Sequence, residues 1–319
     1  MSRILKLIIG FAKTLDKVMV SVYNVLAIGF QITCVKFNKN GGLVLNLKIV
    51  ADSSSNIFEF EGIDYKSVPL KIISESREYV DNSELDVKAM VEEMYESKER
   101  FSTSCPNAFE WSEAFEGGEN IFAVTITKHL SGCYSAAKNA AEDYKEKHPD
   151  CNIYVIDSLS TGGEMQLIIE KLKELNEEGL SFEEIVSAIE KYKKKTHLIF
   201  ALRNLNNLAK NGRVNPAIAK IAGVLGIRIT GKADEGHLKI AHKCKGKEKT
   251  LETMKNDIIE AGFSGGKIRI SHCINEVSAK ALKEKILELF PKSDIEIRPC
   301  TALCSFYAEL GGLIVGFEA

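Results

Sequence analysis

From Leu47 onward, short apolar runs alternate with amphipathic stretches. The apolar runs have the length of strands and end at polar or Gly-containing turns; in the first half they cover residues 47–51, 68–73, 121–126 and 153–157. The intervening stretches predict helices, and three begin with capping-box signatures: Ser83–Asp86, Asn107–Glu110 and Ser181–Glu184. Further helices are expected over residues 131–147 and after Gly163. Strands that alternate with helices predict an α/β fold whose first sheet is mostly parallel and flanked by helices.

The same alternation continues in the second half. Strands are predicted at 197–202, 267–271 and 295–298, a hairpin around 231–236, and helices from 247 and over 276–290. We therefore expect two α/β domains, residues 47–195 and 196–319. Parallel sheets bind ligands beyond the carboxyl ends of their strands, and the loops after Ala51, Ile126 and Asp157 carry Ser, Thr and Gly residues suited to that place.

Residues 1–46 form an apolar N-terminal extension of a different character. The run Val18–Val35 carries no charge but contains Ser21, Asn24, Gln31 and Thr33. Its length is the lower limit for a membrane span. The alternatives are a membrane segment, a helix docked on the body, or a poorly ordered extension from an upstream start site, and the polar residues favour the last two.

Composition narrows the function class. Apolar residues make up 45% and charged residues 27% of 319 residues, and the net charge of -2 gives no reason to expect a nucleic-acid partner. Eight scattered cysteines without a Cys-x-x-Cys pair favour a reduced, cytoplasmic protein. We find no phosphate loop, no dinucleotide fingerprint and no metal-ligand spacing, and we expect no metal and no cofactor.

Two segments carry candidate chemistry. Ser131-Gly132-Cys133 follows a predicted strand and opens a helix, whose first N–H groups could bind a carboxylate or a phosphate; plain N-capping by Ser131 is the alternative. In Phe101–Asn107, Thr103 and Ser104 supply hydroxyl donors beside Cys105.

The cysteines and one arginine admit two interpretations each. Cys105 or Cys133 could act as a nucleophile, which would make the protein a cysteine-dependent hydrolase or acyltransferase, but no base is paired with either in sequence, and both could be inert thiols. Arg213 could hold a carboxylate in a fork or tie loop carbonyls together.

Six segments, in order and at suitable spacing, resemble the DegV family of bacterial lipid-binding proteins. They are the strand and turn Lys48–Ser53, the strand Val68–Leu70, Ser102–Pro106 (family pattern T-S-Q-P), Leu130–Ala136 (L-S-G-T-Y-x-S-A), Val155–Ser158 (V-[IV]-D-[ST]) and Leu205–Val214 (L-x-x-L-x-x-G-G-R-[IV]). The resemblance runs from about Leu47 to the C-terminus. This chain departs from the patterns at Cys105, Cys133 and Asn211, and Tyr307 takes the place of a family His.

The resemblance implies a non-enzymatic protein that binds a long-chain fatty acid, such as palmitate, in an apolar tunnel between two domains, with a role in lipid transport or fatty-acid metabolism. It places the carboxylate at Thr103 and Ser131 with backbone help from Gly132. Nearby support is expected from Ser104, Cys133, Arg213 and Tyr307. In some members a partner fatty-acid kinase phosphorylates the bound acid, so a kinase is a possible partner here.

Overall fold

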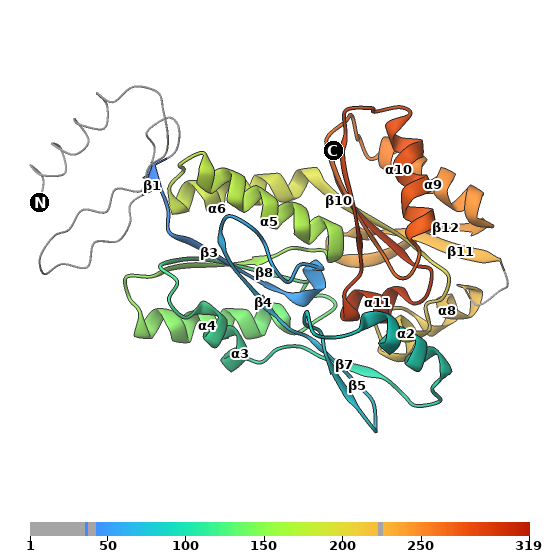
Figure 1. Cartoon of the computed structure of the whole chain (residues 1–319), viewed down its shortest axis with the longest axis horizontal. Helices are drawn as coiled ribbons and strands as arrows, with labels where there is room; N and C mark the ends of the chain where they lie inside the picture. The colour runs from blue at the N-terminus through green and yellow to red at the C-terminus, as the bar shows by residue number, and fades with distance from the viewer. Residues whose placement is uncertain (1–35, 38–42, 223–225) are drawn as a thin grey trace, which may run out of the picture.

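The first half of the chain builds a parallel sheet in the strand order β4–β3–β8–β9 (Figure 1). The strands are β3 (Leu47–Asp52), β4 (Asp64–Val68), β8 (Asn120–Thr125) and β9 (Asn152–Asp157). Helices α3 (Ala108–Phe115) and α4 (Cys133–Lys147) cover one face, and α5 (Gly162–Glu177) and α6 (Phe182–Tyr192) cover the other. Because both faces are covered, the central strands β3 and β8 are nearly all apolar and buried. The predicted parallel α/β sheet is confirmed.

The second half builds a six-stranded mixed sheet in the order β12–β11–β10–β15–β13–β14. The strands are β10 (Thr196–Leu202), β11 (Ile227–Asp234), β12 (His237–Lys245), β13 (Lys267–His272), β14 (Asp294–Pro299) and β15 (Leu313–Glu318). Only the β13–β14 pair is parallel. Helices α9 (Lys247–Glu260) and α10 (Glu276–Leu287) cover one face. The last strand, β15, lies between β10 and β13, so the chain ends inside this sheet.

Smaller elements complete the fold. β5 (Lys71–Ile73), β6 (Glu78–Val80) and β7 (Ser102–Ser104) form an antiparallel sheet, and β1 (Lys36–Phe37) pairs with β2 (Leu43–Val44). The remaining helices are α2 (Val87–Glu96), α7 (Asn206–Lys210), α8 (Pro216–Ala222), α11 (Ala302–Ala308) and the short 3-10 turns η1 (Ser53–Ser55) and η2 (Lys193–Lys195). Residues of β5 and α2 share a core with β10 and α11, so the two halves are packed together. The boundary at 195/196 stays a prediction.

The computed structural model describes residues 36–37, 43–222 and 226–319. The apolar run Val18–Val35 lies outside these ranges, so its three interpretations stay open. Within the described ranges, no helix has both the length and the apolar character needed to cross a membrane.

Two local predictions need correction. The run 68–73 is not one strand: it divides at Pro69 and Leu70 into β4 and β5, which belong to different sheets. Proline has no N–H to donate to a ladder, and the N–H of Leu70 instead donates to the Ser53 hydroxyl. The helix predicted from Ser83 begins at Val87, because the Asp86 carboxylate caps it by accepting from Ala89 N–H. The capping boxes at Asn107 and Ser181 are confirmed.

Helix α5 joins the two large sheets. Its residues 162–169 are all buried, because the helix packs on the parallel sheet and its first turns meet β13 and β15. This approach depends on two glycines. A Cβ on Gly163 would overlap the carbonyl of Arg269, and one on Gly316 would overlap the backbone of Glu164.

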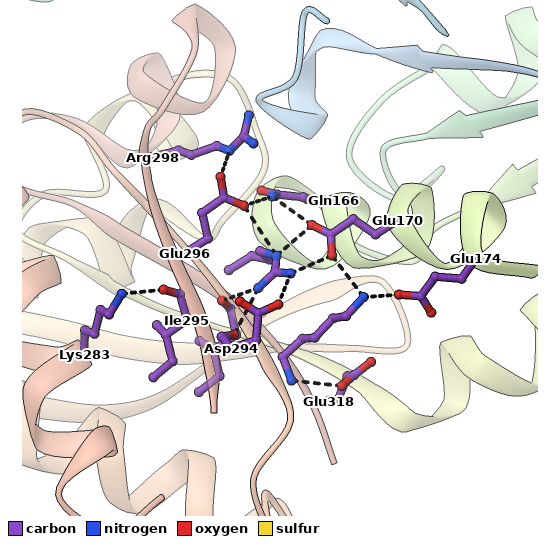
Figure 2. Close-up of polar contacts among 12 residues, drawn as sticks. Gln166, Glu170, Glu174, Lys283, Asp294, Ile295, Glu296, Arg298 and Glu318 are labelled. Atoms are coloured by element: carbon purple, nitrogen blue, oxygen red, sulfur yellow. Dashed lines mark hydrogen bonds and ion pairs between the residues drawn. The ribbon is translucent and has the colours of Figure 1, made fainter. Parts of the chain in front are cut away.

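An ion cluster makes a second tie between α5 and the six-stranded sheet (Figure 2). The Arg269 side chain is only 6% exposed. It donates to both oxygens of Glu170, at 2.7 Å each, and to Asp294 Oδ2 at 2.7 Å. Lys267 bonds Glu170 and Glu174 on the same helix. A bidentate pair of this kind fixes orientation as well as distance.

We predict that Gly163→Ala destabilises the protein far more than Gly117→Ala. The added methyl at 163 meets backbone that cannot rotate away, so we expect a loss of about 3 kcal/mol or more. Gly117 is exposed, with a φ of 75° and open space around it, so alanine there costs only the strain of a positive φ, about 1–2 kcal/mol. Urea unfolding of both variants measures the difference. Equal losses would contradict the close packing of α5 on β15.

Candidate functional site

One cavity lies between the two halves of the chain. It encloses about 900 Å³ of empty space, its open mouth included. Apolar side chains from both halves dominate the lining: Leu70, Ile126, Leu130, Leu198, Phe200, Leu202, Leu208, Leu238, Leu303, Ala308 and Ile314. Polar and sulfur-bearing groups are fewer: Thr103, Cys105, Ser131, Gly132, Thr161, Arg213, Cys304 and Tyr307.

The apolar wall follows from the alternation of β10. Leu198, Phe200 and Leu202 line the cavity, whereas Ile199 and Ala201 point to the opposite face and pack in the core beneath α9 and α10. A strand that is apolar on both faces therefore serves a core on one side and a ligand cavity on the other.

The polar groups include two that come from distant segments. Thr103 lies on β7 and Tyr307 on α11, and their hydroxyl oxygens are 2.7 Å apart. Burial raises the pKa of Tyr307 above its usual 10.0, so the phenol keeps its proton and can donate. Ser131 and Gly132 reach the same cavity from the start of α4. The residues predicted for a carboxylate clamp thus share one cavity.

Two of the predicted supporting residues do not line that cavity. The Ser104 hydroxyl donates to its neighbour's carbonyl, that of Cys105, at 3.3 Å. Cys133 is fully buried as the first residue of α4. Ser104 and Cys133 can therefore support a bound carboxylate only through neighbouring residues that do line the cavity.

Ser131 precedes the N-cap residue of α4, yet its hydroxyl accepts from an N–H of the first turn, so N-capping by Ser131 stays an open alternative. The N-cap position of α4 is Gly132, and no side chain caps it. Ser131 Oγ accepts weakly from Cys133 N–H, at 3.3 Å, and lies 3.2 Å from Cys133 Sγ. Apart from the Cys133 N–H, the first turn of α4 has no side-chain acceptor among the described residues, so its remaining N–H groups can bind an anion.

Arg213 lines the cavity, but its guanidinium donates to backbone carbonyls. Its Nε donates to the Leu130 carbonyl at 3.2 Å and its Nη1 donates to the Asn211 carbonyl. This is the second of its two predicted roles, and it fixes the loop that carries Ser131 against the second half of the chain.

Two thiols meet beside Gly132. The hydrogen bond from the Cys133 thiol lowers the pKa of Cys105 from 9.0 to about 6, with further donation from the N–H groups of Cys105 and Gly132. Burial raises the pKa of Cys133 well above its usual range. Among the cavity residues of the described chain none is a histidine, so the hydrolase alternative lacks the imidazole base that a cysteine nucleophile ordinarily uses.

Helix α11 is held by a carboxylate that the sequence analysis missed. Asp81 accepts from Ala302 N–H at 2.7 Å, from Leu303 N–H at 3.1 Å and from the Thr301 hydroxyl at 3.2 Å. Desolvation by burial nevertheless raises the pKa of Asp81 from 3.8 to about 6. Nothing near Asp81 in sequence signals this role, because its partners lie at the other end of the chain.

Comparison with known proteins identifies relatives along nearly the whole described chain. The family model described as "Uncharacterised protein, DegV family" matches residues 46–319. A DegV domain-containing protein of Streptococcus pneumoniae is 44% identical over 276 residues, which are 85% of this chain and 98% of the relative.

Two solved structures share the fold at similar identity. The Streptococcus pneumoniae Fatty Acid Kinase (Fak) B3 protein, loaded with linoleic acid, superimposes with a TM-score of 0.84 at 43% identity, covering 86% of this chain and 99% of that one. A DegV family protein from Eubacterium eligens, loaded with heptadecanoic acid, gives a TM-score of 0.84 at 41% identity, with the same coverage of 86% and 99%.

We predict that Asp81→Asn flattens part of the pH dependence of stability. With its pKa raised from 3.8 to about 6 in the folded state, Asp81 makes the folded chain bind more protons than the unfolded chain between about pH 4 and 6. Its contribution to the unfolding free energy therefore falls as pH rises through that window, by about 2 kcal/mol, and is constant above it. The asparagine side chain of the variant does not titrate, so it makes no such contribution, whatever the absolute cost of the substitution.

Urea unfolding at pH 4.5 and 7 measures the effect as a difference between two pH values. Asp86→Asn is the matched control, because Asp86 also caps a helix start but is exposed. A D81N variant with the same pH dependence as the wild type would contradict the raised pKa.

Proposed function

The chain belongs to the DegV family, and from this premise we propose that it binds a long-chain fatty acid with the acyl chain in the cavity between its two halves. The observation that carries the proposal is the composition of that cavity: a mostly apolar lining that includes a few neutral hydroxyl donors. A fatty acid has the matching division into tail and carboxylate.

The tail supplies most of the binding free energy. Each methylene that leaves water contributes about 0.8 kcal/mol, and a long-chain acid has many of them. Leu198, Phe200 and Leu202 on β10, with Leu303 and Ile314 from the last part of the chain, give it an apolar path.

In this proposal the carboxylate lies at Thr103, Ser131 and Gly132. Two hydroxyls and the free N–H groups at the start of α4 are neutral donors, and Tyr307 orients Thr103 through their 2.7 Å hydrogen bond. Arg213 is occupied by carbonyls, so its charge acts from a distance. Hydrogen bonds to a charged group are each worth about 1.5–3 kcal/mol. They orient the carboxylate, but they contribute less binding free energy than the acyl chain does.

The structural relatives support a role as a carrier rather than as a catalyst. One of them is a Fatty Acid Kinase (Fak) B3 protein, whose crystal structure is loaded with linoleic acid. By analogy, a partner fatty-acid kinase would act on the bound carboxylate, and this chain would present it in the cytoplasm without performing a chemical step itself.

We predict that protein purified from bacteria carries a long-chain fatty acid. Native mass spectrometry should show a mass addition that organic extraction removes, and the extract should contain the acid. The apolar cavity would otherwise stand open to water, which is unfavourable. Repeatedly empty extracts, together with no binding of added palmitate or oleate, would refute the proposal.

We predict that Thr103→Val with Ser131→Ala weakens oleate binding at least about tenfold while the fold is kept, because two donors to the carboxylate are lost. Isothermal titration of delipidated protein measures the affinity, and circular dichroism checks the fold. Ser104→Ala is the control: Ser104 neighbours Thr103 on β7, but its hydroxyl donates to the Cys105 carbonyl, so the affinity of this variant should match the wild type. Unchanged affinity in the double variant would remove the clamp assignment.

A further inference from the structure

Two thiols lie beside the proposed carboxylate site, on either side of Gly132. Cys105 follows β7, is half-buried and lines the cavity, whereas Cys133 is fully buried at the start of α4. The Cys133 thiol is near enough to the Cys105 sulfur to lower the pKa of Cys105 as a donor. Gly132 lies beside them, and a Cβ there would be 3.1 Å from Cys105 Sγ. Neither thiol is in a disulfide.

The donors that bind the Cys105 sulfur overlap with those of the proposed carboxylate site. Gly132 N–H contributes to the lowered pKa of Cys105, and Gly132 is also part of the proposed clamp. A thiolate at Cys105 and a fatty-acid carboxylate would place two negative charges on one set of neutral donors, and each disfavours the other.

We propose that Cys105 and Cys133 are an oxidisable thiol pair whose reactivity depends on whether the cavity holds a fatty acid. In the empty protein Cys105 reacts with a peroxide and Cys133 closes a disulfide; in the loaded protein the carboxylate keeps Cys105 protonated and shielded. The protection by ligand rests on the proposed function, whereas the oxidation of the empty protein does not.

The chemistry balances with a peroxide as the oxidant. The Cys105 thiolate attacks one oxygen of hydrogen peroxide, the O–O bond breaks, and hydroxide leaves, giving a sulfenic acid. Cys133 sulfur then attacks the Cys105 sulfur, the S–O bond breaks, and the hydroxyl leaves as water with a proton. Two thiols and one peroxide become one disulfide and two waters.

A buried base stands beside the resolving thiol. The Asp52 carboxylate is fully buried, accepts from Ile126 N–H at 2.7 Å and lies near enough to Cys133 for that thiol to influence its pKa. Burial raises the pKa of Asp52 from 3.8 to about 6, so at pH 7 it is largely ionised and can take the proton that Cys133 releases. The charge of Asp52 also raises the pKa of Cys133, so Cys133 attacks as a thiol whose proton passes to this carboxylate while the S–S bond forms.

Other thiols of the described chain are poor competitors for the oxidant, because Cys151, Cys244, Cys273, Cys300 and Cys304 are all buried. Burial raises the pKa of Cys151, Cys273, Cys300 and Cys304, so these remain protonated at neutral pH. Oxidation is therefore expected to be selective for the pair.

The test treats the delipidated full chain with hydrogen peroxide at pH 7, alone and saturated with oleate. Peptide mapping should find Cys105 joined to Cys133 in the empty protein. Oleate should slow this at least about tenfold, because a bound carboxylate both raises the pKa of Cys105, which removes thiolate, and covers its sulfur against the peroxide. In Cys133→Ser, Cys105 should stop as a sulfenic acid that dimedone traps.

Three results would overturn the proposal: Cys105 staying reduced in the empty protein, Cys105 oxidised without Cys133 in the wild type, or equal rates with and without bound oleate. Titration of oleate into the same preparation tests fatty-acid binding separately from the oxidation of the thiol pair. If oleate does not bind, the proposed function and the protection fail together, and the peptide map of the empty protein still decides whether the thiol pair exists. Cys300→Ser is the control and should oxidise like the wild type.

Discussion

The cavity depends on one buried carboxylate at the start of α11. Asp81 accepts from Ala302 N–H, Leu303 N–H and the Thr301 hydroxyl, and it replaces with fixed donors the water that it lost on burial. Helix α11 carries Leu303, Cys304, Tyr307 and Ala308 into the cavity wall. If this attachment were loose, the Tyr307 hydroxyl would not meet Thr103. The polar and apolar parts of the site would then no longer be held in a fixed position relative to each other. The helix is only one turn or two long, so its placement comes from this contact rather than from intrinsic helix stability.

Local patterns were enough to predict the first sheet and part of the site. Buried parallel strands are continuous apolar runs with polar ends, so β3, β8 and β9 could be located, and with them the segment that holds Ser131 and Gly132. The hydroxyls of β7 could be noticed as a cluster, but their use required the resemblance. Helix α11 and Asp81 could not be predicted, because the bond from Ala302 to Asp81 spans 221 positions and neither segment carries a local signal. Both predicted roles of Ser131 remain compatible with the structure, because Ser131 lines the cavity and its hydroxyl also accepts from the Cys133 N–H.

The neutrality of the donors has a functional consequence. A cavity that held its carboxylate with a free guanidinium would add a strong, geometrically fixed charge interaction. Here Arg213 is tied to the Leu130 and Asn211 carbonyls, and the proposed clamp is made of hydroxyls and backbone. Most of the affinity then comes from the tail, so the headgroup can be offered to a partner without much of the binding free energy being lost. This division suits a protein that retains a lipid while another protein acts on its carboxylate.

The residue that stands in place of the family His determines which group makes this headgroup site sensitive to pH. An imidazole changes charge near neutrality, whereas the Tyr307 phenol, with its pKa raised above 10.0 by burial, stays uncharged throughout the physiological range. The group that titrates beside the carboxylate is instead Cys105, with its pKa lowered to about 6. Its charge has the opposite sign to that of a protonated His. A protonated His would favour carboxylate binding as pH falls by adding a positive charge, and Cys105 favours it as pH falls by losing a negative one. In the proposed site, carboxylate binding is therefore favoured as pH falls through the pKa of a thiol, which, unlike an imidazole, is also open to oxidation.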